Sequence, residues 1–143
     1  MERKSGVLMH ISSLYGDYSI GSFGREAKEF VDFLAECGFS YWQVLPFCMV
    51  DDCNSPYQSY STFAGNPYFI DLDLLKDEGL LELSEYENID WESVPNKVNY
   101  GVLYEKRYPL LKIAYKRFIE KEDKDYESFC DEQSFWLNDY SIF

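Results

Sequence analysis

The sequence predicts an α/β fold that begins with a strand–helix–strand unit, and three observations support this prediction. An apolar run at Gly6–Ile11 is bounded by Gly and Ser residues, as in a buried strand. A segment with helical spacing follows, and a second apolar run at Tyr41–Phe47 is interrupted only near its end by Pro46. Because a helix of about four turns separates the two runs, we expect neighbouring, parallel strands that are covered on both faces.

The helix between the strands is predicted from four apolar residues that recur at i, i+3, i+4 and i+7 and therefore share one face. These residues are Ala27, Phe30, Val31 and Leu34. Ser22 is expected to cap the start of this helix, and Gly38 is expected to end it.

Ligands of parallel sheets lie at the carboxyl ends of the strands, which directs attention to two segments, His10–Leu14 and Phe47–Tyr68. The second is a long loop, and its aromatic residues and prolines favour an ordered, functional loop. After it, Phe69–Leu72 is expected to form a short strand, and Leu74–Leu81 a helical turn closed by Gly79.

Beyond Ser84 the pattern is helical, with no further buried strand. One stripe at helical spacing consists of Tyr104, Tyr108, Leu111, Tyr115 and Phe118. Pro109 lies within it, so a helix is expected to kink or begin there. Phe129, Trp136, Tyr140 and Phe143 indicate a last helix. That helix has no stop signal, so we expect the natural chain to continue.

Composition narrows the classes of function. Acidic residues number 26 against 13 basic ones, and the net charge of −13 argues against nucleic acids and anionic membranes as partners. No segment resembles a signal peptide or a membrane helix. The four cysteines form no Cys-x-x-Cys motif, which favours a reduced, cytoplasmic protein. Aromatic residues make up 19% of the chain, which suits a large core or flat ligand platforms.

No catalytic or metal site follows from the residues alone. His10, Cys48 and Cys53 have the wrong spacing for zinc and lack a fourth ligand, so a hydrogen-bonded histidine at a strand end is favoured. Asp51 and Asp52 are adjacent in a loop, where carboxylates are usually solvated. The glycines after the first strand match neither a dinucleotide nor a phosphate motif, and no cofactor is expected.

Several motifs together resemble the 4-alpha-glucanotransferase family, which includes the amylomaltases and disproportionating enzymes. They cover almost the whole chain and are most specific between residues 41 and 72. The motifs are Ser5–His10, Ser12–Leu14, Tyr41–Pro46, Asn54–Ser59, Phe63–Tyr68, Ile70–Leu72, Val98–Gly101 and Trp136–Tyr140.

The resemblance implies an α/β fold that is the N-terminal part of a (β/α)₈ TIM barrel with helical insertions. Residues 1–83 would form the first β/α units with the substrate-side loop, and residues 84–143 a helical insertion. A whole barrel takes about 250 residues, so the barrel would be incomplete here. The implied reaction transfers α-1,4-glucan segments to the 4-hydroxyl of glucose or a maltodextrin by a retaining double displacement, without a cofactor.

The implied site residues of this chain contact the substrate only. Ser55 and Tyr57 match family positions that line the glucan groove, and Asn54 and Gln58 flank them. Asn66 is expected to be a turn residue that bonds its own backbone. The family's catalytic carboxylates would lie beyond this chain, so the chain alone is expected to be inactive.

Two other functions remain open at this point. The loop around Tyr57 could grip α-glucan without any chemistry, which a titration with maltoheptaose would detect. Alternatively, the chain could be a structural remnant, in which case exposed barrel edges predict self-association, visible by light scattering.

Overall fold

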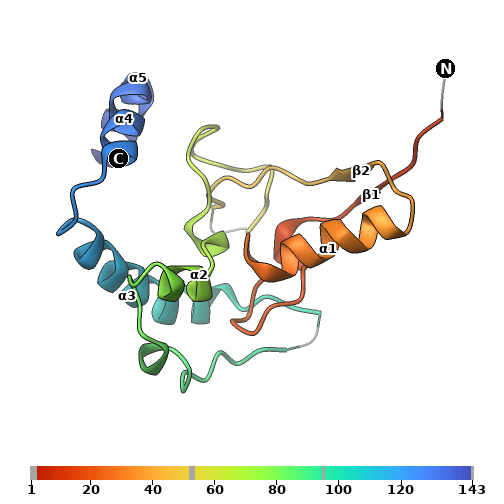
Figure 1. The fold of residues 1–143 in the computed structure, drawn as a ribbon, viewed down its shortest axis with the longest axis horizontal. Coiled ribbons are helices and arrows are strands. Elements are labelled where there is room, and N and C mark those ends of the chain that lie inside the picture. The colour runs from red at the N-terminus through yellow and green to blue at the C-terminus, as the bar shows by residue number, and fades with distance from the viewer. Residues whose placement is uncertain (1–2, 52–53, 95, 143) are drawn as a thin grey trace.

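The computed structural model describes residues 3–51, 54–94 and 96–142. In this part of the chain, two short parallel strands, β1 (Gly6–Leu8) and β2 (Tyr41–Gln43), pair side by side with Val7 opposite Trp42. The helix α1 (Arg25–Glu36) connects them and lies beside the pair (Figure 1). The predicted strand–helix–strand unit is therefore confirmed.

Both strands are shorter and more exposed than expected. Ile11 is buried, but it belongs to a 3₁₀ turn at Ile11–Ser13 and not to β1. In β2 only the central residue faces α1, where the Trp42 ring meets Phe30 at a centroid distance of 5.0 Å. Side chains alternate along a strand, so Tyr41 points the other way and is 61% exposed. The expectation of two fully covered strands was wrong.

The helix α1 confirms part of the predicted apolar face. Ala27 and Leu34 are buried and Phe30 is half-buried, whereas Val31 is 49% exposed because the face in contact is narrower than the pattern suggested. The predicted stop is confirmed, since Gly38 follows the helix with φ of 78°, a left-handed conformation that favours glycine.

Ser22 does not cap α1, contrary to the prediction. Gly24 occupies the N-cap position without a side-chain hydrogen bond. The Ser22 hydroxyl instead donates to Asp71 Oδ2 at 2.5 Å. The same carboxylate lies so close to Gly24 that an added Cβ would stand 2.0 Å from Oδ2. Ser22 and Gly24 thus serve a tertiary contact.

The expected strand at residues 69–72 is absent from the structure. Pro67–Phe69 forms a 3₁₀ turn, and Asp71 starts the helix α2 (Leu72–Asp77) by accepting a hydrogen bond from the Leu74 amide at 2.9 Å. The predicted helical turn before Gly79 is therefore present, although it begins two residues earlier. The first amides of a helix have no partner within the helix, and the Asp71 carboxylate accepts one of these hydrogen bonds. This cap favours a helix start at Asp71 over the expected strand.

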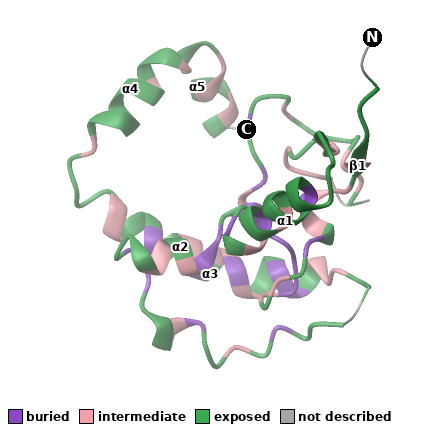
Figure 2. Ribbon diagram, turned by 45° about the vertical axis from the view of Figure 1, so that its right-hand side comes forward, coloured by how far each residue is buried: buried purple, intermediate pink, exposed green. Residues whose placement is uncertain are grey.

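The long helix α3 (Tyr100–Phe118) passes through Pro109 without ending. Its buried face differs from the predicted aromatic stripe, because Tyr104 and Tyr115 are 67% and 57% exposed. The residues buried on α3 are Val102, Leu103, Arg107, Leu110 and Ala114. Figure 2 shows buried stretches alternating with exposed ones along α3.

Arg107 is the largest fully buried side chain of the core. Its Nη2 donates to the carbonyl oxygen of Ile70. Burial lowers the pKa of Arg107 to about 10, and the charge of Asp71 acts in the opposite direction. The guanidinium therefore stays charged at neutral pH. We call Ser22, Asp71 and Arg107 the Asp71 cluster; it links α1, α2 and α3.

The single last helix that was expected is two helices, α4 (Lys124–Glu132) and α5 (Ser134–Ile142). Among the described residues neither helix has a buried side chain. In Figure 1 they stand apart from the core at the end of α3. Their attachment to the rest of the chain therefore depends on few contacts, which are described below.

Replacing Asp71 by Ala should destabilise the fold more than an ordinary capping loss. The variant removes the α2 cap, the Ser22 acceptor and the charge that faces Arg107, so we expect a loss of about 2 kcal/mol or more. Asp123→Ala is the matched control, because Asp123 caps α4 through Tyr126 N at 2.8 Å on an exposed site. That control should cost about 1 kcal/mol. Urea unfolding measures both, and equal losses would contradict the role of the cluster.

Candidate functional site

The loop between β2 and α2 is closed at its base. The Asn66 amide donates to the Phe47 carbonyl oxygen at 2.9 Å, and Cys48 and Gly65 form an antiparallel bridge. The Asn66 side chain is buried, and its Oδ1 accepts from Tyr68 N at 3.0 Å. This confirms the predicted turn role of Asn66 and fixes both ends of the loop.

Within the loop, the four predicted site residues lie on one compact turn. The Asn54 amide donates to the Asp51 carbonyl at 2.9 Å, and the Gln58 amide donates to the Ser55 carbonyl at 3.1 Å. The Asp51 amide closes the turn on the Gln58 carbonyl at 3.2 Å. The Ser55 hydroxyl accepts from Tyr57 N at 3.4 Å. Asn54 has φ of 57°, as a turn residue can.

This turn presents its side chains to solvent. Tyr57 is 73% exposed, Asn54 and Gln58 are exposed, and Ser55 is half-buried beneath them. An exposed ring beside hydroxyl and amide groups can stack on a pyranose and bond its hydroxyls. The turn therefore has the chemistry of a saccharide contact.

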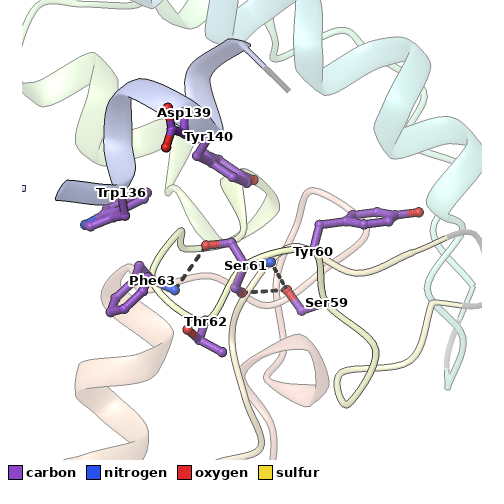
Figure 3. A pocket seen from close by; sticks show the side chains of 8 residues that line it. All are labelled: Ser59, Tyr60, Ser61, Thr62, Phe63, Trp136, Asp139 and Tyr140. Carbon is purple, nitrogen blue, oxygen red and sulfur yellow. Dashed lines mark hydrogen bonds between the residues drawn. The ribbon is translucent and has the colours of Figure 1, made fainter. Parts of the chain in front are cut away.

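A cleft of about 470 Å³ adjoins the turn along the chain, since its first lining residue, Ser59, directly follows Gln58. The four predicted residues are not among those that line it. Its walls come from the loop and from α5, which are distant in sequence (Figure 3). The lining residues are Ser59, Tyr60, Ser61, Thr62, Phe63, Trp136, Asp139 and Tyr140.

Aromatic contacts join the two walls of the cleft. The Phe63 ring stacks on Trp136 with centroids 5.6 Å apart and an interplanar angle of 21°, and its edge meets Phe135 at 5.3 Å. The loop is fixed next to Phe63 by Ser61 Oγ, which accepts hydrogen bonds from the amides of Phe63 and Ala64 at 3.2 and 3.1 Å. α5 is thus fastened to the loop mainly by ring contacts.

Polar groups complete the cleft. Figure 3 shows the Tyr140 ring extending toward Ser61, with Asp139 beside it on α5. Hydroxyl and carboxylate groups next to a tryptophan face suit a polyhydroxylated ligand. Sequence reasoning missed these α5 residues as site residues. The signal was present, because Trp136–Tyr140 was one of the motifs that carried the resemblance.

His10 is not hydrogen-bonded through Nδ1 as expected, because this atom is buried without a partner. The ring packs edge-on against Phe69 at 5.4 Å, and burial lowers the pKa of His10. Cys48 carries a free thiol, while Cys53 and Asp52 lie outside the described residues. Across the described ranges, no three His, Cys, Asp or Glu side chains gather as a metal site would require.

Comparison with known proteins decides the family. A family model described as 4-alpha-glucanotransferase matches residues 9–143. The chain belongs to the 4-alpha-glucanotransferase family. The resemblance in the motifs between residues 41 and 72 is therefore confirmed.

Individual members of the family agree. The 4-alpha-glucanotransferase of Streptococcus pneumoniae is 53% identical over 95% of this chain and 27% of its own length. That of Thermus thermophilus is 42% identical over 100% of this chain and 28% of its own length. An amylomaltase from Streptococcus agalactiae in complex with acarbose matches 97% of this chain and 28% of its own, with a TM-score of 0.91 and 46% identity.

This 4-alpha-glucanotransferase family chain thus spans little more than a quarter of the length of these relatives. Its α/β content and its likeness to an amylomaltase structure confirm the predicted fold class at that level. Of the helices formed by the described residues, none is both long and apolar enough to cross a membrane.

Phe63→Ala should release α5 from the loop with little effect on the core. We expect faster amide hydrogen exchange in residues 134–142 and a red shift of Trp136 emission, with a loss of global stability of about 1 kcal/mol. The matched control is Phe33→Ala on α1, since Phe33 is 55% exposed and stacks on Phe30 at 6.3 Å. Unchanged exchange in α5 would show that other contacts hold this helix.

Proposed function

We propose that this chain forms part of a 4-alpha-glucanotransferase and supplies side chains of its substrate groove. The reaction transfers segments of α-1,4-glucan to the 4-hydroxyl of glucose or of a maltodextrin by a retaining double displacement. Family membership supports this activity, and the acarbose complex of the S. agalactiae amylomaltase supports binding of a saccharide-like ligand. The observation that carries the groove role is the Tyr57 ring, exposed on a turn that is otherwise closed by its own hydrogen bonds.

The groove is proposed to run from the Tyr57 turn toward the α5 cleft. Ser55, Asn54 and Gln58 offer hydroxyl and amide groups around Tyr57, and the cleft continues from Ser59. Alternating rings and hydrogen-bonding groups match the two kinds of surface on a sugar, its C–H faces and its hydroxyl edges. A chain of several glucose units would use both regions.

The bond-breaking groups are proposed to lie outside this chain. Retaining transfer needs two carboxyl groups about 5–5.5 Å apart, one as nucleophile and one as acid and base. The chain alone is therefore expected to bind glucan without catalysing its transfer. A (β/α)₈ barrel, of which β1, α1 and β2 would be the first unit, would place those groups at the same rim as Tyr57.

Two further proposals concern the surroundings of the chain. Free thiols at Cys37, Cys48 and Cys130 support a reducing, cytoplasmic location. Leu8 and Tyr41, 58% and 61% exposed on the strand pair, support self-association of the isolated chain. Light scattering that shows a monomer across a range of concentrations would contradict the second proposal.

Tyr57→Ala should weaken binding of maltoheptaose about threefold to tenfold, because it removes the ring face without disturbing the turn. Calorimetry of the 143-residue chain measures this. Tyr115→Ala is the control, since Tyr115 is 57% exposed but lies on α3 and not on the loop. Equal affinity of the parent chain and the Tyr57 variant would overturn the groove role.

The same chain incubated with maltotriose should leave the sugar unchanged, as judged by chromatography. Release of glucose together with longer maltodextrins would show that the chain carries its own catalytic groups, and would refute their placement elsewhere.

A further inference from the structure

A second pocket lies away from the Tyr57 turn and shares no lining residue with the α5 cleft. It forms between the segment that follows β1, residues 12–20, and residues 93, 94 and 96–98, which precede α3. Its volume of about 770 Å³ falls within the ~300–1,000 Å³ typical of pockets for small molecules. The proposed groove makes no use of this pocket.

The lining of this pocket combines two kinds of surface. The hydroxyl and amide groups come from Ser12, Ser13, Ser19, Ser93 and Asn96. An apolar floor comes from the buried Leu14 and Ile20, and Val94 and Val98 add further apolar side chains, of which Val94 is 58% exposed. Tyr15, 77% exposed, adds a ring at the rim.

Ser19 supplies the observation that points to a ligand. The residue is 8% exposed, and its Oγ is buried without any hydrogen-bond partner, although the residue lines the pocket. A buried hydroxyl without a partner costs about 1–3 kcal/mol, so native proteins rarely keep one unless something else bonds it. A ligand hydroxyl would satisfy it once the Ser19 side chain turns into the pocket, since Oγ has almost no exposed surface in the unliganded chain.

The backbone of the pocket is left-handed at two of its polar residues, one on each of the two segments that form it. Ser19 has φ of 67° and Asn96 has φ of 71°. Asn adopts this conformation readily, whereas at Ser19 it costs free energy. Such conformations tend to persist at binding sites, where they direct a side chain.

We propose that this pocket binds a neutral mono- or disaccharide. Pyranose C–H faces fit the apolar floor and the Tyr15 ring, and sugar hydroxyls fit the Ser and Asn groups. An anion is disfavoured, because Lys97 is the one cationic side chain among the lining residues and the whole chain carries a net charge of −13. The Ser19 hydroxyl, which has almost no exposed surface in the unliganded chain, turns into the pocket and bonds the sugar.

The test titrates the isotope-labelled 143-residue chain with maltose and follows the backbone amides by NMR. Saturable shifts are expected at Gly16, Ser19 and Asn96. Ser19→Gly removes the hydroxyl but tolerates the positive φ, and should weaken binding about threefold to tenfold. Ser128→Ala on the exposed face of α4 is the control and should leave the affinity unchanged.

Thermal unfolding separates a ligand role from a structural one. Because the Ser19 hydroxyl has no partner within the protein, Ser19→Gly should keep or raise the melting temperature while it weakens sugar binding. A lower melting temperature with unchanged affinity would overturn the proposal. Ser19→Ala repeats the comparison with a side chain present.

The remaining outcomes are equally decisive. Shifts confined to the Tyr57 turn would overturn this pocket while leaving the proposed groove intact. Shifts at Ser19 and Asn96 that survive Tyr57→Ala would support the pocket independently of the groove. Binding of inorganic phosphate at the same amides, without any response to maltose, would replace the saccharide by an anion and overturn the proposal.

Discussion

The buried carboxylate of Asp71 is the constraint on which the rest of the structure depends. It starts α2, receives the hydroxyl that precedes α1, and faces the charge of Arg107 on α3. A charge is costly to bury, so these partners must all be in place together. Because Arg107 also bonds the Ile70 carbonyl, the cluster fixes the point where the long loop returns to the core. The position of the Tyr57 turn follows from that anchor.

Local pattern predicted the first strands, their parallel pairing and α1, but it missed the start of α2 at Asp71 and the division of the last helix into α4 and α5. The strand–helix–strand unit and the glycine stop of α1 followed from periodicity, which is a property of neighbouring residues. Ser22 was predicted to cap α1 because the residues around it do not reveal that the Asp71 carboxylate, distant in sequence, accepts its hydrogen bond. Arg107 was overlooked for the same reason: a charged residue is expected on the surface until its partner is known. The aromatic stripe on α3 was only partly right, because Tyr104 and Tyr115 face outward whereas Tyr108 and Phe118 pack against the core.

The candidate site also has a part that was predicted from the sequence and a part that was not. Ser55, Tyr57, Asn54 and Gln58 came from a motif whose residues are adjacent, and the structure places them on one turn. The cleft joins Ser59–Phe63 to Trp136–Tyr140, and only folding brings those segments together. The pocket at Ser19 depends on an unsatisfied hydroxyl and a left-handed backbone, neither of which a residue sequence displays. Apart from the pairing of β1 with β2, contacts between distant segments were not predicted, whereas the residues grouped on the Tyr57 turn came from a single segment.

The closed base of the loop has an evolutionary consequence. The Asn66 amide and the Cys48–Gly65 bridge hold the two ends together whatever lies between them. Lengthening a closed loop adds little entropic cost, about 0.6 kcal/mol per doubling of its length. Insertions and deletions between these ends are therefore tolerated by the core, so the length and reach of this loop can diverge between lineages while the scaffold beneath it stays the same.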